Sequence, residues 1–192
     1  MKWLLLLIGS ALVNNVVLVR FLGTCPFLGM SRSIKTGASM GLATTFVLVG
    51  AGVVTWLVDR FLLIPMRLGY LRTLAFILVI AVFVQFLEMV VRKTNRKLYE
   101  AFGIYLALIT TNCAVLGLAL TASNSSYGLG ETAVFGLGTG LGFTLALLLM
   151  AGIREELAYA PLPRAFEGTG LALVIAGLLS LSFMGFAGLV PL

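Results

Sequence analysis

The sequence contains no histidine, few charged residues and only two cysteines, and each scarcity excludes something. Without histidine, the chain by itself cannot form a histidine-based catalytic triad, zinc site or haem ligand. Charged residues make up 10% of the chain, against about a quarter in ordinary soluble domains. This deficit excludes a water-soluble globule. The 60% hydrophobic content also excludes a chain disordered through its polarity.

What the sequence has instead is six long hydrophobic segments, each close to the ~20 residues that cross a bilayer as a helix. They predict an all-α integral membrane protein that forms a single membrane domain over residues 1–192, with no segment left for a soluble domain. The first segment begins like a signal peptide but continues without a small-residue cleavage site, so we expect it to be retained. The segments are 3–19, 37–58, 73–91, 101–120, 132–153 and 169–189.

The net charge of +6 indicates membrane topology rather than nucleic-acid binding, because the positive residues lie in the short connectors. Lys and Arg of membrane proteins gather on the cytoplasmic side. The connectors after the first, third and fifth segments hold nine positive residues, and the opposite side holds four, namely Lys2, Arg60, Arg67 and Arg72. This bias predicts a multi-pass protein with both termini outside the cytoplasm.

The two halves of the chain, about 1–97 and 98–192, share short motifs in the same order. Residues 25–29 and 113–117 match as C-x-x-L-G, and residues 41–44 and 136–139 match as G-L-x-T. A three-helix unit repeated once must enter the membrane in opposite orientations, as in many transporters. We therefore predict two inverted three-helix repeats, although unrelated membrane helices also share Gly and Leu motifs.

Cys25 and Cys113 occupy equivalent places in the two halves, beside polar residues and helix breakers. Three interpretations remain open: two buried free thiols, a disulfide, or half of a soft-metal site. Spacing alone favours buried thiols, whereas the symmetric placement favours the metal. Asn15, Thr24 and Asn112 could donate hydrogen bonds to a thiolate, or Asn14, Asn15 and Asn112 could simply join helices.

The two cysteines can meet only if the first helix is broken. Along straight helices Cys113 would lie about 18 Å from Ala101, near mid-bilayer, whereas Cys25 would lie about 33 Å from Trp3. Gly23 and Pro26 favour such an interruption. We expect broken first helices in both repeats, because irregular backbone at membrane depth must be satisfied by protein or a cavity.

The stretches around these cysteines resemble a known family. Residues 12–15, 21–29, 88–89, 108–117 and 183–186 are similar to the A subunits of Rnf complexes, which are ion-translocating ferredoxin:NAD oxidoreductases, and to the paralogous E subunit of the sodium-pumping NADH:quinone reductase. The resemblance covers essentially the whole chain. The connector 68–72 is closer to the Rnf member.

This resemblance implies a subunit of a redox-driven pump in the bacterial inner membrane, with periplasmic termini. Cys25 and Cys113 would supply half of the ligands of an intramembrane [2Fe–2S] cluster shared with a homologous subunit of opposite topology, the E type. The cluster would carry electrons across the bilayer between Rnf subunits that hold flavins and Fe–S clusters, coupled to Na⁺ or H⁺ movement. No complete active site is expected in this chain.

Two other features carry weaker functional interpretations. Glu88 and Gln85 in the third segment are candidates for an ion path, although Glu88 and Arg92 at i,i+4 are also typical of a snorkelling pair. Glycines 136, 138, 140 and 142 predict two small-residue faces for close helix packing. The function classes left as alternatives are an inverted-repeat small-solute transporter without a cofactor and a structural anchor for redox subunits.

Overall fold

The computed structural model describes residues 2–31, 33–66, 69–94, 108–159 and 169–186, and all regular structure within these ranges is helical. The longer elements are α3 (Ile34–Val58), α5 (Arg72–Thr94) and α8 (Leu129–Leu157). The shorter ones are α1 (Lys2–Ile8), α2 (Thr24–Met30), α4 (Ile64–Met66), α7 (Cys113–Asn124) and α9 (Thr169–Met184). Two π-helical turns, η1 (Gly9–Val13) and η2 (Asp59–Leu63), extend α1 and α3, and a 3₁₀ turn, η3 (Gly69–Leu71), precedes α5.

Three helical stretches are long and apolar enough to cross a membrane, namely Ile34–Leu63, Gly69–Lys93 and Leu129–Leu157. Three shorter apolar helical stretches overlap the first, fourth and sixth predicted segments, namely Lys2–Val13, Leu108–Asn124 and Thr169–Met184. The all-helical membrane character predicted from composition is therefore confirmed, and the count of six spans stays a prediction.

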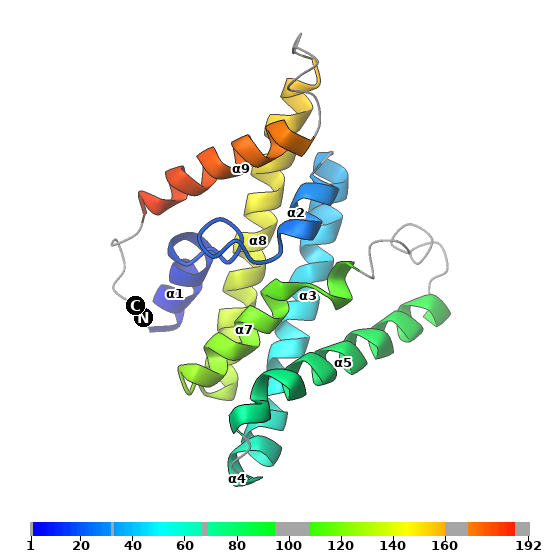
Figure 1. Ribbon diagram of the computed structural model, residues 1–192, viewed down its shortest axis with the longest axis vertical. Coiled ribbons are helices and arrows are strands. Elements are labelled where there is room, and N and C mark those ends of the chain that lie inside the picture. The colour runs from blue at the N-terminus through cyan, green and yellow to red at the C-terminus, as the bar shows by residue number, and fades with distance from the viewer. Residues whose placement is uncertain (1, 32, 67–68, 95–107, 160–168, 187–192) are drawn as a thin grey trace.

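Helices α3 and α8 form the centre of the molecule and run antiparallel (Figure 1). Small residues bring their backbones together, because a Cβ atom placed on Gly136 would lie 3.3 Å from the Cα of Val49. The contact is reciprocal one turn further along: a Cβ on Gly140 would meet Thr45, and a Cβ on Gly41 would meet Thr144. Each helix thus places a threonine over a glycine of the other helix.

The second glycine face of α8 packs on the first helix. A Cβ on Gly142 would lie 2.5 Å from the Ala11 carbonyl oxygen, and one on Gly138 would overlap the Ser10 hydroxyl. The alternating glycines thus serve two interfaces, as the sequence predicts: 136 and 140 face α3, and 138 and 142 face α1 and η1.

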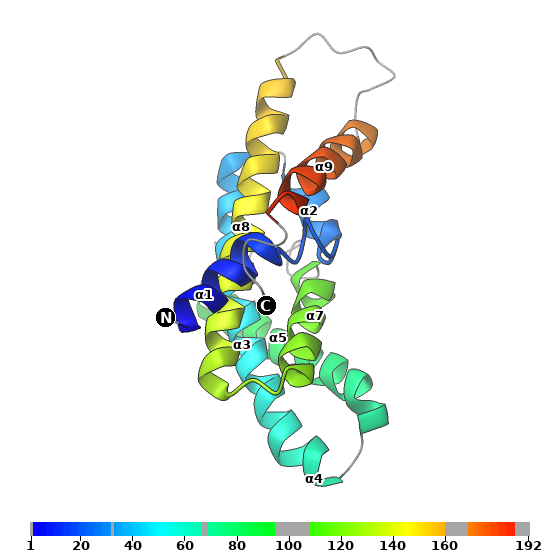
Figure 2. The ribbon, with the colours of Figure 1, turned by 90° about the vertical axis from the view of Figure 1, so that its left-hand side faces the viewer.

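The remaining helices flank this pair, with α2, α7 and α9 together on one side of it (Figure 2). Helices α5 and α9 leave from opposite ends of the pair and run to opposite sides (Figure 1). Helix α5 buries Phe76, Ile80 and Val84 at four-residue spacing. On another face it exposes large apolar side chains, as expected of a surface that meets lipid or other membrane subunits: Leu74, Leu78, Val82, Phe86 and Met89.

Candidate functional site

The first predicted span is interrupted, and the irregular segment leads toward the two cysteines. After η1 ends at Val13 the chain leaves the helical path, and α2 begins only at Thr24. Two residues in this break have positive φ angles, Phe21 (+53°) and Gly23 (+83°). The interruption that Gly23 and Pro26 predict is therefore present, and it begins well before either residue.

Asn15 satisfies much of the backbone in the break. Its side chain is fully buried. The Oδ1 atom accepts hydrogen bonds from the backbone N–H groups of Val17 (3.0 Å) and Leu18 (3.3 Å). The Nδ2 group donates to the carbonyl oxygens of Ala11 (3.1 Å) and Gly142 (2.9 Å). Asn15 thus holds the break against α8 and supplies what water would supply outside a membrane.

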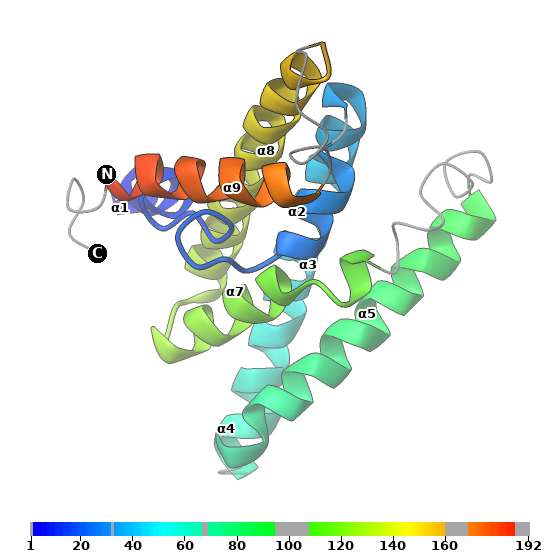
Figure 3. The same ribbon diagram turned by 45° about the horizontal axis from the view of Figure 1, so that its top comes forward.

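Helix α9 completes this support from the other side. The buried Ser180 hydroxyl donates to the Leu18 carbonyl oxygen at 2.6 Å. Figure 3 shows α9 running past the break on its way along α1 and α2. The irregular segment is therefore clasped between α8 and α9, with polar partners from both.

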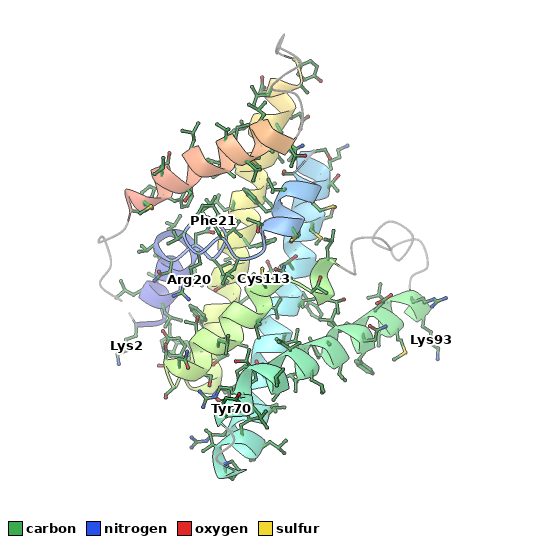
Figure 4. The ribbon with its side chains drawn as sticks, in the orientation of Figure 1. Lys2, Arg20, Phe21, Tyr70, Lys93 and Cys113 are labelled. Atoms are coloured by element: carbon green, nitrogen blue, oxygen red, sulfur yellow. The ribbon has the colours of Figure 1, made fainter. Side chains whose placement is uncertain are left out.

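The break leads directly to the second cysteine. The backbone N–H of Gly23 donates to Cys113 Sγ at 2.9 Å, and Cys25 follows two residues later in the first turn of α2. Cys113 itself is the first residue of α7. Figure 4 shows Cys113 near the centre of the molecule, next to the segment that carries Phe21. Gly23, two residues before Cys25, therefore contacts Cys113, so the chain segments that carry the two cysteines lie next to one another.

The fourth predicted span is interrupted as well, immediately before Cys113. Residues 108–110 are helical, Thr111 is in a turn, and Asn112 is extended and caps α7. The Asn112 Oδ1 atom accepts from the N–H of Ala114 at 3.0 Å, which fixes the first turn of α7. Both cysteines thus follow a helix break, which agrees with the prediction of a broken first helix in each half of the chain.

Both thiols are free and solvent-exposed in the isolated chain. The structure therefore contradicts burial of Cys25 and Cys113 within this chain and a disulfide between them, whereas the thiols are free as the first interpretation predicts. Within the described ranges, no group of three or more Cys, Asp or Glu side chains is close enough to hold a metal. Two soft sulfur donors on an open surface make an incomplete ligand set, which a second polypeptide can complete.

The three residues proposed to surround the cysteines have different positions. Asn15 donates both of its amide hydrogens to backbone carbonyls, so it braces the break and has none left for a thiolate. Thr24 Oγ1 makes a long 3.4 Å bond to the Phe21 carbonyl. Asn112 is 5% exposed, and its Nδ2 group has no acceptor among the described residues.

The candidates for an ion path lie elsewhere. Glu88 is half-buried and Gln85 exposed, both on α5. Lys93, near the end of the same helix, lies far to the side of Cys113 (Figure 4). Glu88 and Gln85 thus lie on a helix that carries neither cysteine, and their role stays a prediction.

Sequence reasoning missed a buried carboxylate. Asp59, at the start of η2, is 8% exposed; its Oδ2 accepts from the Ser123 hydroxyl (2.6 Å) and its Oδ1 lies 3.4 Å from Arg72 Nε. The pair Asp59–Arg60 looks like a connector in the sequence. The apolar residues that follow this pair up to Leu63 could have indicated it, because they allow the spanning helix to continue past Asp59, and an acid within a spanning helix is a functional candidate by default.

Comparison with known proteins accounts for nearly the whole chain. Residues 3–190 match the family model described as Rnf-Nqr subunit, membrane protein. Proteins named as the A subunit of the ion-translocating oxidoreductase complex are 56% identical in Azoarcus sp. (strain BH72) and 57% identical in Proteus mirabilis (strain HI4320). These alignments cover 98% and 99% of this chain, and 97% and 98% of the relatives. The A subunit of the same complex from Yersinia enterocolitica (strain NCTC 13174 / 8081) is 58% identical over 98% of both chains.

The predicted resemblance is thus confirmed over nearly the whole chain, and the chain belongs to the Rnf-Nqr family of membrane subunits.

Proposed function

We propose that this chain is the A-type membrane component of a redox-driven, ion-translocating oxidoreductase complex and that Cys25 and Cys113 hold half of an intramembrane [2Fe–2S] cluster. The observation that supports the cluster proposal is the hydrogen bond from Gly23 to Cys113 Sγ, because it brings the segment that leads into Cys25 next to Cys113, and both thiols are exposed. The names of relatives at 56–58% identity support the role in the complex.

The donors fit such a group in kind and in number. A [2Fe–2S] cluster takes four Cys thiolates, and the chain contains two cysteines in all. The missing pair would come from a homologous membrane subunit of opposite topology, the E type, seated over the exposed thiols. When bound, the cluster accepts and releases one electron, and neighbouring subunits with flavins and further Fe–S centres would exchange it.

The chain's own residues hold the ligands in position. Asn112 fixes the first turn of α7 and hence the Cα of Cys113. Asn15 and Ser180 fix the break that leads to Cys25. Cys113 lies at the N-terminal end of a helix, where the helix dipole favours the negative charge of a thiolate-ligated cluster.

Two inverted repeats would give this site its place in a pump. The antiparallel α3/α8 pair supports the repeat, because Thr45 and Thr144 each bond the carbonyl of the glycine four residues earlier and each face the other helix's glycine. A unit charge arriving at low dielectric acts strongly on nearby helices. Reduction would therefore bias which face of the repeat interface is open to Na⁺ or H⁺.

A small-solute transporter is the second candidate, and one cavity favours it. The cavity has a volume of about 210 Å³ and polar walls that include Ser10, Asn14, Arg20 and Thr121. Iron in the purified complex separates the two functions, because a transporter of this kind contains none.

The test is iron analysis and EPR of the purified complex. We expect Cys25→Ser and Cys113→Ser complexes to assemble but to lose the iron and the EPR signal of one [2Fe–2S] cluster, together with electron flow and ion uptake. Ser182→Ala, at an exposed position on α9, is the control and should change none of these. Full iron content and electron flow in both cysteine variants would refute the cluster.

A further inference from the structure

We propose that the backbone N–H of Gly23, assisted by the side-chain amide of Asn112, sets the reduction potential of the site by hydrogen bonding to sulfur. This inference rests on the proposed [2Fe–2S] function and goes beyond ligation. It makes Gly23 and Asn112 tuning residues, and it explains two features that ligation leaves open: an obligatory glycine and an unpaired buried amide.

The first observation is the direction of the Gly23 N–H bond. The nitrogen lies 2.9 Å from Cys113 Sγ, although it belongs to the other half of the chain. Its orientation depends on a φ of +83°, which side-chain-bearing residues rarely adopt. Gly23 also precedes α2 directly, as its N-cap residue. The conformation that starts α2 therefore turns this N–H toward the sulfur.

The second observation is steric. A Cβ atom on Gly23 would lie 3.0 Å from Asn112 Oδ1, 3.0 Å from Phe143 Cε2 and 3.2 Å from Ala114 Cβ. Only glycine fits this approach without moving its neighbours. The close approach is what brings the N–H within reach of Cys113.

The third observation is the Asn112 side chain, which packs against the same spot. Its Oδ1 is engaged by the N–H of Ala114. Its Nδ2 is buried and lacks an acceptor within the described part of the chain. A buried N–H without a partner costs about 1–3 kcal/mol, and a sulfur-rich group bound beside Cys113 would supply acceptors.

The expected effect has a definite sign. Hydrogen bonds to cluster sulfurs stabilise the more negative, reduced state and so raise the potential. Removal of a donor should lower it. We expect a shift of up to tenfold in the reduction equilibrium, which corresponds to about 59 mV for a one-electron couple.

The experiment uses the intact complex in two forms. In the first, cells are grown with [¹⁵N]glycine, and pulsed EPR of the reduced cluster is recorded. We expect a ¹⁵N coupling that disappears in Gly23→Ala and persists in Gly29→Ala, since Gly29 also lies on α2 and has open space around its Cα. In the second, an EPR-monitored redox titration compares the wild type with Gly23→Ala and Asn112→Ser. Serine keeps a capping oxygen but lacks the amide donor.

The outcomes separate this inference from the function on which it rests. A wild-type complex without a cluster refutes the proposed function. A cluster that shows no glycine coupling, or an unchanged potential in Asn112→Ser, overturns this inference and leaves the function standing. If Gly23→Ala does not assemble, the labelled wild type and Asn112→Ser decide the matter.

Discussion

Asn14 and Asn15 are adjacent and chemically identical, yet only Asn15 holds the surrounding backbone together through hydrogen bonds. Asn15 is fully buried and joins Ala11, Val17, Leu18 and Gly142, whereas the side chain of Asn14 is half-buried at the wall of the polar cavity. The sequence could not separate the two, because the difference depends on a partner more than a hundred positions away.

This contrast gives a paired prediction. Asn15→Ala should destabilise the protein by at least about 2 kcal/mol, because leaving a single buried backbone group unpaired costs about 1–3 kcal/mol. Asn14→Ala should cost much less. The measurement is the thermal unfolding midpoint of the detergent-solubilised complex. Equal midpoints for the two variants would contradict the role of Asn15.

Helix α8 shows how an element can serve two interfaces with one residue type. Its glycines at 136 and 140 allow α3 to pack closely, and those at 138 and 142 allow the first helix to do so. The alternating pattern made both faces predictable, because helical geometry separates such positions. The contacts of Gly41 with Thr144 and of Gly140 with Thr45 were not predictable, because helices of this composition can pack in several registers one turn apart.

Substitutions on α8 should therefore depend on position. Gly142→Ala places a methyl group 2.5 Å from the Ala11 carbonyl oxygen, so we expect a loss of about 1–3 kcal/mol through overpacking. Gly152→Ala is the matched control on the same helix, with open space around it. Since alanine favours helix by about 1 kcal/mol over glycine, Gly152→Ala should be neutral or stabilising. Thermal midpoints of the two complexes provide the comparison, and a stable Gly142→Ala complex would refute the close packing.

Across the whole molecule, the sequence predicted the helical hydrophobic segments and the broken first span better than the contacts that hold them, and a joint cysteine site stays a prediction. Segment positions and helix breakers are local properties, and the paired Cys motifs are visible by comparing the two halves. The hydrogen bonds from Ser123 to Asp59 and from Ser180 to Leu18 are tertiary contacts. Each joins two elements that no local sequence pattern connects.

Asp59, Arg72 and Ser123 form a polar cluster that joins three elements, η2, α5 and α7. The cluster predicts how charge removal affects the stability of the whole molecule. Asp59→Asn and Arg72→Gln should each lower the thermal midpoint, because each leaves a partly buried partner without its counter-charge. The double variant should lose less than the sum of the two, as expected of directly coupled residues. Strict additivity would show that the 3.4 Å approach carries no coupling energy.

The bond from Ser180 to the Leu18 carbonyl also constrains how the protein is made. Ser180 follows Leu18 by 162 positions, so Leu18 is synthesised well before its partner. During synthesis the break therefore lacks this hydrogen bond until α9 has been made. A chain cut before α9 would therefore contain the irregular segment but lack one of the hydrogen bonds that fix it.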